Sequence, residues 1–165
     1  MNSGTTPGKG GLIDLLFKHN NWANLRLLDA CGALSQEQLG HEAAGTYGTI
    51  IGTMTHLVRA QERYLYHLDG YESSEPAQIT IKDLHKRASE SGEVLRQFAQ
   101  NITEDRVLTI GSEEPEEIPA FVILLQALHH AEEHRAQVAS IMGRLGVEPP
   151  GLSGWDYFDE VLAGS

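Results

Sequence analysis

Apolar residues recur at offsets of three and four in four long segments of the chain, which is the period of a helix with one buried face. Glycine ends most of these segments, and Thr80 and Pro119 are residues that suit a helix N-terminus. The pattern therefore predicts four long amphipathic helices. They run from Leu12 to Gly32, from just after Gly48 to Gly70, from Thr80 to Phe98, and from about Pro119 to Gly143 or Gly146.

Shorter elements are expected between and after these helices. Ser35 and Gln38 have the spacing of a capping box, which predicts a short turn of helix. The pair Pro149-Pro150 stops the fourth long helix. The other expected elements are a polar linker at residues 71–78, a small hairpin made of residues 107–110 and 113–118, and a final short helix at residues 155–162.

Four amphipathic helices of about 20 residues favour an all-α fold, an antiparallel up-and-down four-helix bundle. The short C-terminal helix and the hairpin before the fourth long helix would be additions to this bundle. A chain of 165 residues is long enough for one domain with its own core. We therefore expect a flexible lead-in at residues 1–11 and a single domain at residues 12–165.

Composition and charge narrow the setting in which the protein acts. Apolar residues make up 41% of the chain, and the net charge of −11 argues against a surface that binds nucleic acid. The single cysteine, Cys31, excludes an intramolecular disulfide and is typical of a reducing compartment. The chain shows no apolar signal segment, and its longest apolar stretch, Ala120–Leu125, is too short to span a bilayer. We expect a cytoplasmic protein without nucleic-acid or membrane partners.

Two histidines with metal-ligand spacing give the first indication of chemistry. His130 and His134 are four residues apart, so both imidazoles project from one face of the fourth helix and can reach a single divalent cation. On the second helix His56 lies off the apolar stripe, and its neighbours one turn away are small, including Gly52 and Ala60. The expected site is a cleft between the second and fourth helices that opens to solvent. Solvated helix surface is the alternative interpretation of the pair.

The run His130-Ala-Glu-Glu133-His134 also fits the H-x-x-E-H pattern of inverted zinc peptidases, in which the glutamate is the general base. Those enzymes take a further acidic ligand well downstream in a large catalytic domain. Only 31 residues follow His134 in this chain. The peptidase interpretation is therefore disfavoured.

Several motifs in the right order resemble those of the DinB/YfiT-like family of metal-dependent enzymes. The run Thr53–Glu62 (TMTHLVRAQE) is similar to the family's second-helix signature, and His130–Val138 (HAEEHRAQV) is similar to its fourth-helix motif. The resemblance covers nearly the whole chain and is weakest at residues 1–11 and 71–118. Two positions depart from the pattern: Ala136 replaces the usual glycine and Glu133 replaces a common second histidine. Neither departure removes a ligand.

The resemblance implies that His56, His130 and His134 bind one divalent ion, with water or substrate completing the shell. Zinc is the metal expected in an open site of neutral imidazoles, and nickel and iron are chemically reasonable. The resemblance also implies a bundle that pairs as a homodimer, and relatives that include transferases using low-molecular-weight thiols and others assigned as hydrolases.

The first functional hypothesis is therefore a metal-dependent enzyme, either a thiol-dependent S-transferase or a hydrolase of small molecules. Glu133 is the candidate general base, and the residues expected around the substrate are Trp22, Tyr64, Gln126 and Gln137. The alternative hypothesis is a stress-associated, non-enzymatic metal-binding bundle whose ion stabilises the fold or the dimer. Openness of the site separates the two hypotheses, because structural zinc sites are closed by four protein ligands, here with Glu133 or Asp156 as the fourth.

Overall fold

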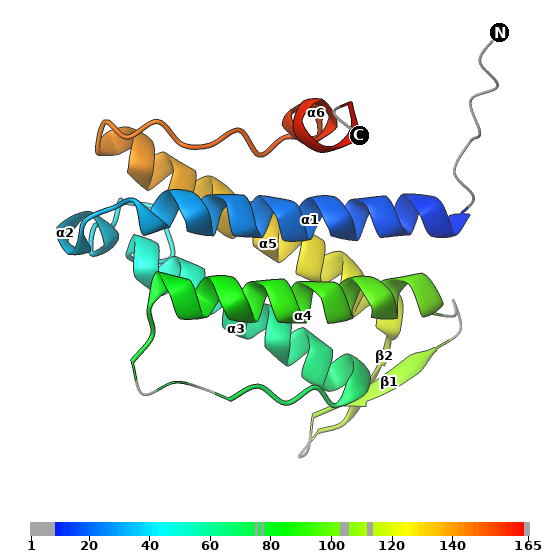
Figure 1. The fold of residues 1–165 in the computed structure, drawn as a ribbon. Coiled ribbons are helices and arrows are strands. Elements are labelled where there is room, and N and C mark those ends of the chain that lie inside the picture. Colours follow the sequence, from blue (N-terminus) through cyan, green and yellow to red (C-terminus); the bar gives the residue numbers. More distant parts are fainter. Residues whose placement is uncertain (1–8, 75, 77, 103–105, 112–113, 164–165) are drawn as a thin grey trace, which may run out of the picture.

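The computed structural model describes residues 9–74, 76, 78–102, 106–111 and 114–163. In this part of the chain the fold is mostly helical with one small two-stranded antiparallel sheet (Figure 1). The elements in chain order are α1 (Lys9–Gly32), α2 (Gln36–Leu39), α3 (Ile50–Asp69), α4 (Ile81–Asn101), β1 (Val107–Ile110), β2 (Glu116–Pro119), α5 (Ala120–Arg144), α6 (Gly154–Tyr157) and η1 (Phe158–Leu162), the last being one π-helical turn.

Side-chain caps set the helix boundaries where the sequence predicts them. Ser35 forms the predicted capping box at the start of α2, and Thr80 caps α4 by accepting a hydrogen bond from the Asp83 backbone N–H. Gly70 ends α3 with φ of 69°, a left-handed conformation that glycine adopts without steric cost. The first helix starts earlier than expected, at Lys9, so the last residues of the predicted lead-in are helical. Residues 1–8 of that lead-in lie outside the described residues.

The predicted hairpin is present, with a small shift in its second strand. The two strands pair from Val107 with Pro119 to Ile110 with Glu116. Gly111 follows β1 with φ of 96°, and a Cβ there would come within 2.7 Å of the Glu114 carbonyl oxygen. Pro119 ends β2 and precedes α5, so the hairpin directs the chain straight into the helix that carries two of the candidate ligands.

The four long helices surround two apolar clusters, one at each end of the fold. The first cluster contains Leu28 of α1, Met54 of α3, Leu84 of α4 and Met142 of α5. The second contains residues from the other end of each helix, such as Phe17 and Leu95. Therefore α1 and α5 run from the second cluster to the first, whereas α3 and α4 run from the first to the second (Figure 1).

This arrangement corrects the predicted up-and-down order, because α3 and α4 run parallel to each other. The described residues between these two helices, 70–74, 76 and 78–80, lie on a path that leads back past α3 to the start of α4 (Figure 1). Eleven residues can extend over about 36–40 Å, whereas a helix of 20 residues is about 30 Å long. The linker is therefore long enough to run the whole length of α3 and let α4 start beside the first residues of α3. A short turn of the kind that joins antiparallel helices would be too short for this.

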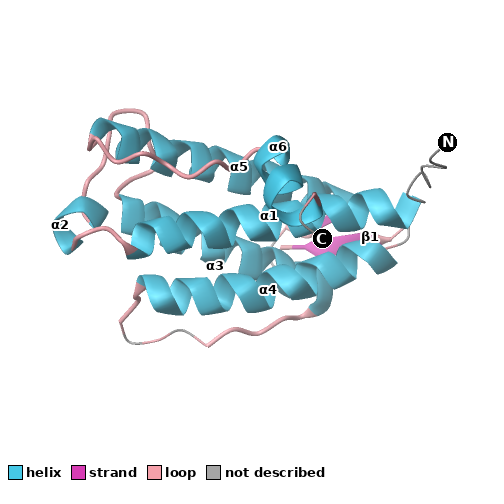
Figure 2. Ribbon diagram, turned by 45° about the horizontal axis from the view of Figure 1, so that its top comes forward, coloured by secondary structure: helices cyan, strands magenta, loops and turns pink. Residues whose placement is uncertain are grey.

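The C-terminal elements pack against the outside of the long helices. Figure 2 shows α6 beside α1, and the ring of Tyr157 meets the ring of Trp22 on α1 at a centroid distance of 5.2 Å. Gly154–Tyr157 and the π turn together replace the single short helix that the sequence predicts at residues 155–162. Among the described residues, no helix combines the length and apolar character needed to cross a membrane.

Candidate metal centre

Three histidines from two helices converge at one point. His130 Nε2 on α5 lies 3.0 Å from His56 Nε2 on α3 and 3.1 Å from His134 Nε2. One ligand atom from each histidine can be chosen so that all three lie within 4.8 Å of one another. Two imidazole nitrogens bound to one tetrahedral zinc ion would be about 3.3 Å apart, given Zn–N distances near 2.0–2.1 Å. The observed separations therefore suit a shared ion.

Local helix geometry accounts for this convergence. His130 and His134 lie one turn apart on α5, and the buried Ala131 and Val138 turn that side of the helix toward the core. On α3, His56 immediately precedes Leu57, which is buried in the first cluster. The packing of α3 against α5 then brings the three rings together at the rim of the core, as the sequence predicts.

Gln137 orients the most buried ligand. Its Oε1 atom lies 3.0 Å from His134 Nδ1 and accepts the backbone N–H of Tyr47 at 3.1 Å. Because this oxygen is an acceptor, His134 Nδ1 carries the proton of the neutral ring and Nε2 keeps its lone pair. Gln137 therefore fixes the tautomer that a metal ligand needs.

Tyr47 is a site residue that no sequence pattern indicates. Its ring stacks on His56 with centroids 4.1 Å apart and an interplanar angle of 20°, and it meets His134 edge-on at 5.3 Å. It lies in the irregular segment between α2 and α3, where no periodic pattern indicates which way a side chain points. Only the contacts of the folded chain identify it.

Two of the three histidines are held in the neutral form. Burial, with smaller contributions from His134 and His56, lowers the pKa of His130 to about 4. Burial, followed by the influence of His134, also lowers the pKa of His56. A metal ion binds the neutral form of imidazole through its unprotonated nitrogen. At neutral pH these two histidines are therefore in the form that binds a divalent cation.

A cavity of about 320 Å³ opens beside the histidines. Tyr64 forms part of its wall, and its ring meets His130 edge-on at 5.9 Å. Burial raises the pKa of the Tyr64 hydroxyl, and this effect outweighs a hydrogen bond with Gln126 that lowers the pKa. The size suits a small ligand. The residues that line the cavity are His56, Arg59, Ala60, Arg63, Tyr64 and His130.

The other predicted site residues fall into two groups. Glu133 is exposed, lies one turn from Gln137 and accepts a hydrogen bond from Gln137 Nε2 at 3.4 Å, so it belongs to the edge of the site. Trp22 does not line the cavity: its ring packs against His19 and Tyr157, with the Arg26 guanidinium 5.3 Å from the ring centroid. The face of α1 that carries Trp22 is covered by the C-terminal segment instead.

A buried polar layer crosses the fold next to the site. Arg135, which follows His134, donates to Asn20 Oδ1 at 2.8 Å and to Asn24 Oδ1 at 2.7 Å. Asn24 donates to Gln61 on α3, and Gln61 donates to Ser91 on α4 at 2.7 Å. All five side chains are buried. The layer therefore links all four long helices beside the ligand pair of α5.

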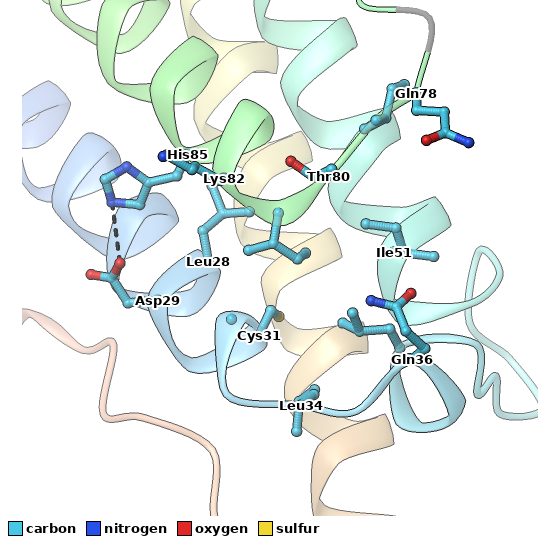
Figure 3. Close-up of a pocket in the computed structure, with 14 residues that line it drawn as sticks. Leu28, Asp29, Cys31, Leu34, Gln36, Ile51, Gln78, Thr80, Lys82 and His85 are labelled. Carbon is cyan, nitrogen blue, oxygen red and sulfur yellow. Dashed lines mark ion pairs between the residues drawn. The ribbon is translucent and has the colours of Figure 1, made fainter.

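A larger cavity than the one beside the histidines lies at the C-terminal end of α1 and the start of α4 (Figure 3). Its volume is about 900 Å³, and Leu28 and Cys31 line its inner part. Burial raises the pKa of the Cys31 thiol to about 12. His85, which the sequence alone leaves solvated, pairs with Asp29 at 3.2 Å at the cavity's edge (Figure 3). None of the three converging histidines lines this cavity.

Comparison with known proteins gives a match at the level of families. The sequence model of the DinB family matches residues 1–160 of the 165-residue chain. A search of curated proteins finds no match.

Proposed function

The chain belongs to the DinB family, and we propose that it is a metal-dependent enzyme whose ion is held by His56, His130 and His134. The observation that carries this proposal is the convergence of three Nε2 atoms at 3.0–3.1 Å contacts beside a cavity that can admit a small molecule. Three protein ligands leave a position open, which is the pattern of catalytic rather than structural sites.

The proposed ion is zinc, because neutral imidazoles in a site of low coordination suit it, with nickel and iron as the other candidates. When bound, a divalent ion would supply Lewis acidity that lowers the pKa of a coordinated thiol or water. The protein's own residues hold this arrangement: Gln137 fixes the His134 ring, and the Tyr47 ring covers His56 on one side.

Within this proposal, thiol-dependent S-transfer to a small electrophile is the first reaction to test, and hydrolysis of a small molecule is the second. Activation of a thiol needs little beyond the ligand set, since a coordinating thiol readily loses its proton. Hydrolysis also calls for a positioned base, and Glu133 is the proposed one. Its carboxylate accepts a hydrogen bond from Gln137 at the edge of the site and is more exposed to solvent than the three histidines.

The alternative is a non-enzymatic, stress-associated protein whose ion only stabilises the fold or the dimer. The cavity beside His56 and His130 favours the enzyme, because a purely structural ion needs no access for a ligand. Neither Glu133 nor Asp156 closes the group: Glu133 bonds Gln137, and Asp156 caps α6 through Ser153.

The proposed protein is a cytoplasmic homodimer of four-helix bundles. The packing of α1 against α4 and α5, and of α3 against the same two helices, supports the bundle. Large apolar side chains remain exposed on α1 and α5, and exposed apolar patches of this kind support the proposed self-association. They include Leu12, Leu16, Phe121 and Leu125.

The proposal is tested first by elemental analysis of protein purified without a metal-affinity tag. We expect about one equivalent of metal in the wild type and its loss in His56→Ala and in His134→Ala. His129→Ala is the matched control, because His129 is the exposed neighbour of His130 on the same helix and should keep the metal. Wild-type protein that takes up neither zinc nor nickel would refute the three-histidine site.

Activity is then assayed on loaded protein with a low-molecular-weight thiol and a small electrophile, and separately with ester and amide substrates. Turnover that depends on both thiol and metal supports S-transfer, and thiol-independent turnover supports hydrolysis. Metal that raises the melting temperature without any turnover supports the non-enzymatic alternative.

A further inference from the structure

One stripe of α3 carries both a proposed metal ligand and two arginines. Arg59 follows His56 by three residues, and Arg63 follows Arg59 by four, so the three side chains share one face of the helix. All three line the cavity that also contains Tyr64 and His130. The cavity therefore has the histidines at one end of the α3 stripe and guanidinium groups along it.

The charge of this cavity is opposite to that of the protein. The chain has 23 acidic and 12 basic residues, yet the residues that line this cavity include two arginines and no aspartate or glutamate. Glu62 lies between the two arginines in sequence, but its side chain points to α4. Its carboxylate accepts a hydrogen bond of 2.8 Å from Arg87 Nε. Its carboxylate is thus committed to the α3–α4 contact.

Arginine pairs favour one class of ligand. The planar guanidinium binds carboxylates with two parallel hydrogen bonds, which gives stronger and more directional recognition than a lysine ammonium. From Arg63 to His56 is two turns of α3, about 10 Å along the helix axis. A small molecule with a carboxylate at one end and a metal-binding group at the other can therefore bridge the arginines and the histidines.

We propose that this cavity selects a small anionic substrate, whose carboxylate is bound by Arg59 and Arg63 while its thiol or other donor atom reaches the three-histidine site. The inference rests on the proposed function and adds the substrate class. Arg59 and Arg63 act as binding residues, and the ion site does not depend on them.

The test uses cobalt-loaded protein and three small thiols of similar length: 3-mercaptopropionate, which is anionic, 2-mercaptoethanol, which is neutral, and cysteamine, which is cationic. Binding is followed by the change in the visible absorption of cobalt. We expect 3-mercaptopropionate to bind at least about tenfold more tightly than 2-mercaptoethanol, and cysteamine to bind most weakly. Arg63→Met and Arg59→Met should each reduce the preference for the anion severalfold and leave cobalt content unchanged.

Arg144→Met is the matched control, because Arg144 is an exposed arginine at the far end of α5, and it should keep the full preference. Equal affinities for the three thiols in metal-loaded wild type would overturn the anion preference and leave the proposed metal enzyme standing. Failure of the wild type to take up cobalt, zinc or nickel would overturn both. Circular dichroism of the two arginine variants checks that they are folded like the wild type.

Discussion

The buried contact of Arg135 with α1 gives the sharpest prediction about stability. Arg135 is 4% exposed and donates to Asn20 and Asn24, which are themselves 3% and 0% exposed. Its third partner, Glu132, has a side chain that is 74% exposed. In Arg135→Met the long apolar side chain can still fill the space, but both asparagine oxygens lose their donor.

The expected cost follows from these contacts. A buried acceptor left without a partner costs about 1–3 kcal/mol, and two acceptors are affected. Part of this cost is offset because the variant no longer buries a guanidinium, whose desolvation also lowers the pKa of Arg135. We therefore expect a loss of about 3 kcal/mol in the free energy of unfolding. For a domain of this size that corresponds to a fall of about 6–12 °C in Tm.

The measurement is urea unfolding followed by circular dichroism, with Tm from a thermal scan of metal-free protein. Glu132→Gln is the matched control, because it removes only the exposed partner and should change stability by less than about 1 kcal/mol. Combining Arg135→Met with Asn20→Leu should cost less than the sum of the two single variants, since the double variant removes donor and acceptor together.

Two results would contradict this reasoning. An unchanged Tm in Arg135→Met would show that the two asparagines find other partners at no cost. Strict additivity of Arg135→Met and Asn20→Leu would show that the 2.8 Å contact carries no energy.

Two further predictions concern the histidines. Gln137→Leu should weaken metal binding by about 10–100-fold, because His134 loses the acceptor that fixes its tautomer. Metal affinity is measured by competition with a chelator, and the control variant Gln126→Leu should leave it unchanged. Equal effects of the two variants would contradict the role assigned to Gln137. The pKa of His130 is lowered to about 4 in the fold, whereas an unfolded chain titrates near 6.5, so the unfolded state binds more protons between these values. The stability of metal-free protein should therefore fall by about 1–3 kcal/mol as pH falls through this window, as measured by urea unfolding, and His130→Gln should flatten that dependence.

The helices could be predicted from the sequence because their signals are local. A helix presents the same face every three to four residues, so the apolar period locates α3, α4 and α5 without knowledge of their neighbours. Caps act within one turn, which is why Thr80 and Gly70 mark boundaries correctly. The relative direction of two helices, in contrast, is not a local property. Whether α4 runs parallel or antiparallel to α3 depends on the path of residues 70–80 and on which faces pack best, and neither is encoded in the period.

The site divides in the same way. His130 and His134 could be paired from their spacing, because one helix alone sets the distance between them. Family resemblance singled out His56, since no local rule relates a residue on one helix to a residue on another. Tyr47 could not be found, because the irregular segment that carries it has no periodicity.

Local sequence patterns are enough to locate the long helices and their ends, and to show which two histidines share a helix face. The folded chain is needed to show that α3 and α4 run parallel, that Trp22 packs against the C-terminal segment, and that Arg59 and Arg63 line the cavity beside the ligands. The difference comes from the distance along the chain over which each interaction acts, because hydrophobic period and capping are properties of a single helix. A cavity and its charge, in contrast, arise where side chains from distant parts of the chain meet.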